Sequence, residues 1–151
     1  MNSSRTLADG LGLCLALGRA HASLSLKLDD ALGAHHGLGW TEFRLLDRLA
    51  RAEGGRLALG ELARPLGLPL SAVLRQVRAL EKTGHVERPG GAGGPREAVV
   101  QLRPAGRAAL ATAAETAAWI CAQAVDGLGL EDPLQWAPRL DALAACAALR
   151  T

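Results

Sequence analysis

Aromatic residues are scarce in this chain of 151 residues, which contains three Trp, one Phe and no Tyr. Ala and Leu dominate its apolar content, and these residues favour helices, whereas strands favour β-branched and aromatic side chains. Three widely separated cysteines do not form a disulfide framework, which indicates a reducing cytoplasm. No run approaches the roughly 20 apolar residues that span a bilayer, and the N-terminus lacks the basic start and cleavage site of a signal peptide. We therefore expect a mainly α, cytoplasmic protein with no membrane segment.

Enzyme and metal motifs are also missing from the sequence. The glycine-rich run at residues 90–94 has no Lys-Ser or Lys-Thr after it, so it does not form a phosphate-binding loop. Ser71 has no neighbouring histidine, the carboxylates are scattered, and no His, Cys or carboxylate cluster has the spacing of metal ligands. We expect neither catalysis, nor a cofactor, nor a metal site.

Charge is unevenly distributed, although the net charge is only +2. Residues 41–103 hold eleven Lys and Arg against seven Asp and Glu, while the rest of the chain holds six against eight. A basic middle third suits a nucleic-acid-binding module flanked by helices with another role. A merely solvated basic face is the alternative.

The two ends of the chain carry the patterns of long helices. Within residues 5–33 the apolar residues recur at spacings of three, four and seven: Leu7, Leu11, Cys14, Leu17, Leu24, Leu28 and Leu32. Such a stripe predicts an amphipathic helix that needs a partner surface. From Pro104 an Ala-rich helix is predicted to about Val125, and a last helix covers about residues 133–149, with a kink at Pro138.

The middle of the chain predicts three shorter helices. The first starts from Thr41, whose hydroxyl suits an N-cap, and ends at Gly54-Gly55. Its buried face holds Phe43, Leu46, Leu49 and Ala50. The second, which Gly67 stops, is outlined by Leu59, Leu62, Ala63 and Leu66. Pro69 opens the third, which ends near Gly84 and buries Val73, Val77 and Leu80. Two short helices separated by Gly-Leu-Pro form a helix-turn-helix pattern.

The third of these helices carries hydrogen-bond donors suited to a DNA major groove. Those on or beside the face opposite the buried one are Ser71, Arg75, Gln76 and Lys82. Arginine pairs bidentately with guanine and glutamine with adenine, while serine reaches phosphate or base. Arg78 lies at the flank, where it would meet backbone phosphate.

A β-hairpin is predicted after this helix. Residues 85–88 and 97–102 have the pattern of strands, joined by the flexible turn PGGAGGP. Arg96 closes the glycine-rich tip, from which it would reach an adjacent minor groove. Arg88 and Arg103 at the strand ends would contact phosphates or remain solvated.

Three motifs in this region occur in a recognisable order and spacing: ELA at residues 61–63, LEKxGxVxR at 80–88 and PxGR at 104–107. With the flanking helices, they give the whole chain a pattern that resembles the MarR family of bacterial winged helix-turn-helix regulators. The resemblance implies a homodimer held by its N- and C-terminal helices that binds pseudo-palindromic DNA operators, usually as a repressor. Many members are released by small aromatic carboxylates or phenols, and some by oxidants.

The chain departs from the family pattern at two places. Family wings commonly carry Asp-x-Arg, but this chain has Gly94-Pro95-Arg96, so the orienting carboxylate is absent and we expect a looser wing. The family's Leu-Thr-Pro is Leu102-Arg103-Pro104 here. The threonine cap is lost, while the proline of the first helical turn remains.

The resemblance also implies an effector pocket where the dimerisation helices meet the DNA-binding segment. That region includes His35, His36, Trp40 and Arg44. An arginine and a histidine near an indole suit an aromatic carboxylate, through ring stacking and charge-assisted hydrogen bonds. Alternatively, Trp40 is a core anchor and the histidines are solvated loop residues.

Cysteine offers another sensing hypothesis. Cys14 resembles in position the sensing cysteine of the organic-hydroperoxide branch of the family, and Cys121 would be its resolving thiol. That branch depends on tyrosines near the thiol, which this chain lacks. The alternative is that Cys14 is a small core hydrophobe.

The sequence thus predicts a mainly α winged helix-turn-helix fold with a small β-hairpin wing and three segments. Residues 1–40 form the N-terminal dimerisation helix and loop, 41–103 the DNA-binding segment, and 104–151 the C-terminal dimerisation helices. The predicted function is a homodimeric regulator that binds double-stranded DNA and is released by a small aromatic acid or phenol. A thiol-based oxidant sensor and a protein-interaction module that does not bind DNA are the alternatives, although the latter would not need the wing arginines.

Overall fold

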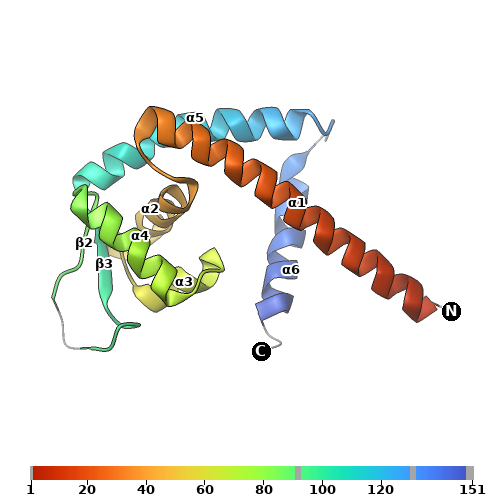
Figure 1. Ribbon diagram of the computed structural model, residues 1–151, viewed down its shortest axis with the longest axis horizontal. Coiled ribbons are helices and arrows are strands. Elements are labelled where there is room, and N and C mark those ends of the chain that lie inside the picture. The colour runs from red at the N-terminus through yellow and green to blue at the C-terminus, as the bar shows by residue number, and fades with distance from the viewer. Residues whose placement is uncertain (1, 91–92, 130–131, 149–151) are drawn as a thin grey trace.

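The computed structural model describes residues 2–90, 93–129 and 132–148. In these ranges the chain forms six α-helices: α1 (Asn2–His36), α2 (Trp40–Arg51), α3 (Leu59–Leu66), α4 (Leu70–Lys82), α5 (Pro104–Asp126) and α6 (Ala137–Ala148). Two 3-10 turns lie at Glu53–Gly55 and Pro133–Trp136. Helices α1 and α5 pack together across the top of the molecule, and α2, α3 and α4 hang below one end, with α6 standing apart from them (Figure 1). The predicted mainly helical fold is confirmed.

Three short strands form one antiparallel sheet in the order β1-β3-β2: β1 (Arg56–Ala58), β2 (Val86–Glu87) and β3 (Val99–Leu102). Leu57 pairs with Val100, and Val86 pairs with Leu102. Strands β2 and β3 are the predicted hairpin, although both are shorter than their patterns indicate. The sequence does not predict β1, because three residues are too few to show an alternation. Since β1 leads directly into α3, it ties the helix-turn-helix to the wing.

One apolar core joins elements from all three predicted segments. Its buried members come from every helix except α6 and from both hairpin strands: Leu28, Leu32, Leu38, Leu45, Leu46, Leu49, Leu59, Leu62, Leu66, Val73, Val77, Leu80, Val86, Val100, Leu102, Ala113, Ala117 and Ile120. In α2, Leu45 is buried and the predicted Phe43 and Ala50 are only half-buried. The three-segment division therefore does not separate three cores.

The N-terminus of α2 is capped by carboxylates, and the predicted N-cap, Thr41, is wrong. The N-cap is Gly39, whose amide donates to Glu42 Oε2 at 2.9 Å. The Trp40 amide donates to Asp29 Oδ1 at 2.6 Å. Carboxylates accept hydrogen bonds from the free amides of a helix start, and their negative charge interacts favourably with the positive end of the helix dipole. Because Asp29 belongs to α1, this bond also joins α1 to α2.

The start of α5 explains the PxGR motif. A Cβ atom at Gly106 would clash with the carbonyl oxygen of His85, so this helix approaches β2 as closely as it does only because residue 106 is glycine. Arg103 is the N-cap without a side-chain cap, and its amide donates to the same His85 carbonyl at 3.0 Å. Pro104 has no backbone N–H, so it leaves no unpaired donor in the first turn of α5.

Helices α1 and α6 differ from their predicted forms. Helix α1 runs from Asn2 to His36, which is longer than the pattern over residues 5–33 indicates. The predicted kink at Pro138 is wrong, because this proline lies in the first turn of α6, where no amide is needed. A 3-10 turn precedes it, and Asp132 Oδ1 accepts from the Leu134 amide at 3.0 Å. Residue 149, the predicted end of the last helix, lies outside the described residues.

Helix α5 is long and apolar enough to cross a membrane by length and composition. It nevertheless carries Arg107 and Glu115, and its apolar content is mainly alanine. Ala113, Ala117 and Ile120 are buried in the core, where α5 packs against α1 and α2. A core helix of this composition passes the same test, so the finding is weak support for a membrane segment.

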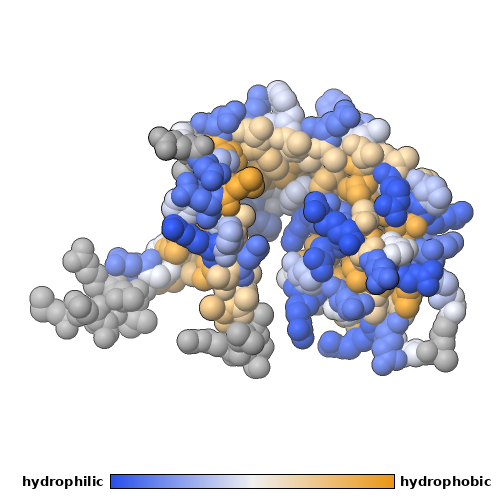
Figure 2. All heavy atoms as spheres, turned by 180° about the vertical axis from the view of Figure 1, so that it is seen from behind, coloured by the Kyte–Doolittle hydropathy of each residue, from blue (hydrophilic) through white to orange (hydrophobic). Residues whose placement is uncertain are grey.

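Large apolar side chains stay exposed towards both ends of the chain: Leu11, Leu13, Leu15, Leu26, Trp119, Leu128, Leu134, Trp136, Leu140 and Leu143. We call residues 28–120 the lobe, and residues 8–27 and 121–147 the two arms. Nine of the ten exposed side chains lie in the arms. Figure 2 shows apolar surface along α5 and down α6, and a mainly hydrophilic surface over the remainder of the lobe.

Candidate nucleic-acid interface

Helices α3 and α4 form the predicted helix-turn-helix. At Gly67, α3 ends with a φ of 64°, a left-handed conformation that glycine adopts without strain. The Gly67 amide donates to the Arg64 carbonyl at 3.1 Å, and the Leu68 amide donates to the Ala63 carbonyl at 3.2 Å. These bonds satisfy carbonyls that the helix end leaves free. Pro69 is then the N-cap of α4, so the turn Gly-Leu-Pro has the predicted role.

One side of α4 packs into the core, and the opposite side is open to solvent. The buried residues are Val73, Val77 and Leu80. At 100° per residue, four exposed residues fall within about 60° of one another on the opposite side. We call these four residues the α4 stripe: Ser71, Arg75, Arg78 and Lys82. Together with Leu74 and Ala79 they line a shallow groove along the helix.

The structure does not place the predicted Gln76 in this groove. Gln76 is half-buried, and a turn of 100° from Arg75 moves it to the side of α4 nearer the core. Its predicted contact with adenine therefore lacks the geometric support that the α4 stripe has.

The root of the wing is anchored on the N-terminus of α3. The Gly60 amide donates to the Arg96 carbonyl, and the Leu59 amide donates to the Ala98 carbonyl, both at 3.0 Å. These are amides that a helix start leaves free. The Glu97 amide donates a hydrogen bond to the Gly94 carbonyl at 3.0 Å and closes the turn. The Arg96 backbone is thus fixed without the family's aspartate, because the loop that carries it is bonded to the start of α3.

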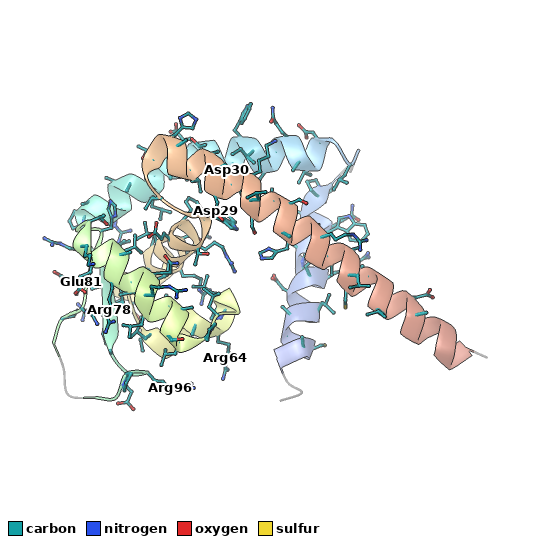
Figure 3. The ribbon with its side chains drawn as sticks, in the orientation of Figure 1. Asp29, Asp30, Arg64, Arg78, Glu81 and Arg96 are labelled. Carbon is teal, nitrogen blue, oxygen red and sulfur yellow. The ribbon has the colours of Figure 1, made fainter. Side chains whose placement is uncertain are left out.

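Arg64 is a candidate contact that sequence reasoning missed. It lines a cleft of about 700 Å³ between α3 and the wing root, together with Arg96 and Pro65. Figure 3 shows Arg64 and Arg96 on the same side of the molecule, at the end where the wing and α3 meet. The two residues are distant in sequence, and only the β1–β3 pairing brings them to one cleft. The exposed position of Arg64 in α3 is the sole sequence signal.

Two predicted arginines differ from the others because they have carboxylate partners. Arg88 donates through Nε and Nη2 to Glu81 Oε2 at 3.0 and 2.7 Å, and these bonds hold the pKa of the Glu81 carboxyl below its usual range. Arg103 Nε lies 3.9 Å from Glu87 Oε2. In contrast, Arg64, Arg75, Arg78, Lys82 and Arg96 form no ion pair with any residue in the described ranges.

The four predicted effector residues do not meet in one pocket. His35 and His36 line an open groove between α1 and α5, where His36 Nε2 is 2.7 Å from Thr116 Oγ1. Trp40 and Arg44 line a separate cleft between α2 and α3. The two pairs are separated because α1 ends and the chain turns between them.

The cleft at Trp40 keeps some features of a ring-binding site. The Trp40 and Phe43 rings stack with centroids 5.2 Å apart. Arg44 Nη2 donates to the Leu66 carbonyl at 3.5 Å, and burial lowers the pKa of Arg44. The cleft holds about 160 Å³, whereas sites for drug-sized ligands hold roughly 300–1,000 Å³. Trp40 is also packed against the core, as the alternative interpretation has it.

The cysteines lie on three different helices. Cys14 is exposed on α1, so it is not a core hydrophobe of this single chain. Cys121 is half-buried on α5, and burial raises its pKa. A raised pKa leaves less thiolate at neutral pH, which weakens a thiol as a nucleophile.

A helix-turn-helix with an open cationic helix face and a three-stranded wing defines the class of winged helix-turn-helix DNA-binding proteins. Comparison with known families agrees, because the MarR family profile matches residues 36–96. A MarR family protein of Mycobacterium tuberculosis, in complex with p-aminosalicylic acid, is 30% identical, with 87% of this chain and 97% of that chain covered and a TM-score of 0.65. The chain belongs to the MarR family of transcriptional regulators.

Other solved structures are similar over most of the chain. A MarR family transcriptional regulator from Streptomyces coelicolor, in complex with DNA, is 25% identical, covers 95% of this chain and 89% of its own, and has a TM-score of 0.76. The M. tuberculosis transcriptional regulator MosR is 26% identical, with coverages of 90% and 95% and a TM-score of 0.72. A comparison with curated protein sequences gives no match.

Proposed function

We propose that this chain is a homodimeric, sequence-specific DNA-binding repressor whose α4 helices enter two major grooves. The α4 stripe carries the proposal, because its exposed donors lie opposite the buried face and its cations form no ion pair with the described residues. A major groove is about 12 Å wide and admits an α-helix. Arginine pairs bidentately with guanine, so we propose that Arg75 binds a guanine in this groove. Phosphates supply the negative charge that the stripe lacks.

The cleft between α3 and the wing extends this interface. Arg64 and Arg96 line the cleft from two elements, and their guanidinium groups suit phosphates or a narrow minor groove beside the α4 contact. A DNA complex of the S. coelicolor relative supports DNA as the partner.

The arms support the homodimer. Exposed leucines at residues 11, 13 and 15 of α1 and at residues 140 and 143 of α6 lack a covering surface in the single chain. A second copy that covers them would form a symmetric interface, and a two-fold dimer binds an inverted-repeat operator with half-sites about one helical turn apart. Such a regulator acts in the cytoplasm.

We propose further that a small aromatic acid releases the repressor from DNA. The complexes of the 30%-identical relative support this ligand class, as do the Trp40–Phe43 stack and the partly buried Arg44 beside it. A ligand that prefers one spacing of the two α4 helices shifts the dimer towards that spacing.

Fluorescence anisotropy on duplex DNA selected from a random pool tests the DNA-binding proposal. With Arg64, Arg78, Lys82 and Arg96 of both protomers on phosphates, the slope of log affinity against log salt is expected near roughly −7. Arg75→Ala should lower the affinity for the selected sequence by at least roughly tenfold and leave the affinity for random DNA nearly unchanged.

Arg51→Ala is the matched control, because Arg51 is an exposed arginine of α2 that pairs with Asp47 at 2.9 Å, outside the stripe. It removes the same charge, and the preference for the selected sequence should survive. Absence of duplex binding, or binding that ignores salt, contradicts the proposal and favours a protein-interaction module.

Thermal-shift titration with p-aminosalicylate tests the effector proposal, with Arg44→Gln as the variant that loses the response. The oxidant-sensing alternative makes a different prediction, in which peroxide releases DNA and Cys14→Ser abolishes that release. A response to peroxide and none to the acid would overturn the effector proposal.

A further inference from the structure

The α4 groove contains apolar surface that the DNA contacts described above do not use. The groove runs between two ridges of side chains at i, i+4 spacing. One ridge is Ser71, Arg75 and Ala79, and the other is Leu74, Arg78 and Lys82. Ala79 is exposed and Leu74 is half-buried, with part of Leu74 packed against the core. The lining of the groove is therefore part cationic and part apolar.

The apolar positions lie on both sides of Arg75. Leu74 precedes it in the chain and belongs to the neighbouring ridge, while Ala79 follows it by about one turn on its own ridge. A guanidinium that reaches a base edge from Arg75 would bring the adjoining base pair against Leu74 or Ala79. The preferred base pair at that position then depends on which base edge can be buried against an apolar side chain.

Only one base offers a methyl group in the major groove. Thymine presents its C5-methyl there beside the O4 acceptor, whereas adenine, guanine and cytosine present hydrogen-bond donors and acceptors without a methyl group. A polar edge pressed against Leu74 or Ala79 would lose its water without gaining a partner, which is unfavourable. A thymine methyl in the same place would be buried favourably.

We propose that Leu74 and Ala79 read the methyl group of a thymine next to the guanine bound by Arg75. The proposal rests on the proposed DNA-binding function and specifies it. Each half-site then contains a thymine that is selected through its methyl group. Burial of one methyl group corresponds to roughly a fourfold change in affinity, and therefore roughly fifteenfold when both half-sites lose it.

Uracil substitution in the selected duplex tests this proposal. Deoxyuridine keeps the Watson–Crick pairing and the O4 acceptor of thymidine and lacks only the methyl group. Each thymidine of the selected site is replaced in turn, and the affinity of the wild-type dimer is measured by fluorescence anisotropy. We expect one position in each half-site to lose roughly fourfold, and the others to lose little.

Two variants assign the methyl contact to residues. In Leu74→Ala the uracil penalty at the sensitive position should fall below about twofold, because the contact surface is gone. Leu110→Ala is the matched control, since Leu110 is also a half-buried leucine packed against the core but lies on α5, outside the groove. The control should keep the full penalty. Ala79→Ser changes an exposed residue, so it tests the groove even where Leu74→Ala proves too unstable to use, and it too should reduce the penalty.

Each of three outcomes would contradict a different claim. A wild-type dimer that binds its selected site with steep salt dependence, but tolerates uracil everywhere, contradicts methyl recognition and leaves DNA binding intact. A full penalty in both Leu74→Ala and Ala79→Ser contradicts the assignment to these residues. Failure to select any sequence contradicts the proposed function itself.

Discussion

The lobe and the two arms use the same apolar residue types in different ways. All eighteen buried hydrophobic side chains of the described residues lie between Leu28 and Ile120, and nine of the ten large exposed ones lie outside that range. Leucine therefore closes a core in the lobe but lies on the surface in the arms. The difference teaches that apolar content alone does not locate a core, because a helix face becomes a core only where other elements cover it.

The lobe and the arms also differ in what they still need. The lobe buries its own core within one chain, and its charged surface is the part that would bind a partner. The exposed apolar side chains of the arms need a covering surface, which we propose is a second copy of the chain. Substitutions of the exposed leucines in the arms should therefore act on assembly, and substitutions in the buried core of the lobe should act on folding.

The largest effect is expected from charges in the arms. Leu140→Asp with Leu143→Asp would bury two unpaired carboxylates in the proposed dimer, at a cost of several kcal/mol. Sedimentation velocity should show monomers, and DNA affinity should fall more than about 100-fold, because one chain engages one half-site. Leu140→Met with Leu143→Met is the control. A dimer that survives the aspartates contradicts the assignment of α6 to the interface.

A cavity in the lobe should come next in size. Leu46 is fully buried in α2, so Leu46→Ala should lower the free energy of unfolding by about 2–5 kcal/mol in urea titrations. Leu26→Ala removes the same atoms from a side chain that is 65% exposed in the single chain. Its cost should change with protein concentration, because we propose that dimerisation covers the exposed side chains of the arms. If both variants lost the same unfolding free energy at every protein concentration, the distinction between lobe and arm would be contradicted.

A smaller effect is expected from an added methyl group inside the lobe. Gly106→Ala forces its Cβ against the His85 carbonyl, and the resulting shift of α5 should cost about 1–3 kcal/mol of unfolding free energy. Gly33→Ala is the control in α1, where a Cβ meets nothing within 4 Å. There alanine should stabilise the helix by up to about 1 kcal/mol. Thermal melts that show the same sign for both variants would contradict the close approach.

The smallest effect is expected at the half-buried ion pair between Glu81 of α4 and Arg88 of the wing. Because Arg88 lowers the pKa of Glu81 in the folded state, the stability from this pair is present above the ordinary value of 4.5 and is lost as pH falls below it. Glu81→Gln should therefore cost under about 1 kcal/mol at neutral pH and nearly nothing in acid. Urea titrations at both pH values measure the difference, and an equal cost at the two would contradict it.

Local patterns predicted the helix-turn-helix well. Gly67 and Pro69 mark the turn because their backbone preferences act within a few residues, and the 3.6-residue period separates Val73, Val77 and Leu80 from the exposed Arg75. The same period places Gln76 about 40° from the buried Leu80 and 100° from Arg75, so it also separates Gln76 from the stripe. Fold and stripe were accordingly predictable from local patterns.

Contacts between distant segments were not predictable in the same way. The Asp29 cap on α2, the strand β1 and the cleft that joins Arg64 to Arg96 each depend on residues far apart in the chain. The predicted effector residues are divided between two clefts in the single chain for the same reason, since His36 and Trp40 are four residues apart yet line different clefts. Closeness in the sequence therefore did not show which residues line the same cleft.

The sequence by itself determined the helices, the turn between α3 and α4, and the cationic face of α4, because backbone preference and helical period act over a few residues. The tertiary structure alone decided which apolar faces are covered. Leu28 and Cys14 belong to the same predicted stripe of α1, and Leu28 is buried while Cys14 is exposed. Their burial differs because α2 and α5 pack against the C-terminal part of α1, and no local pattern records where a packing neighbour stops.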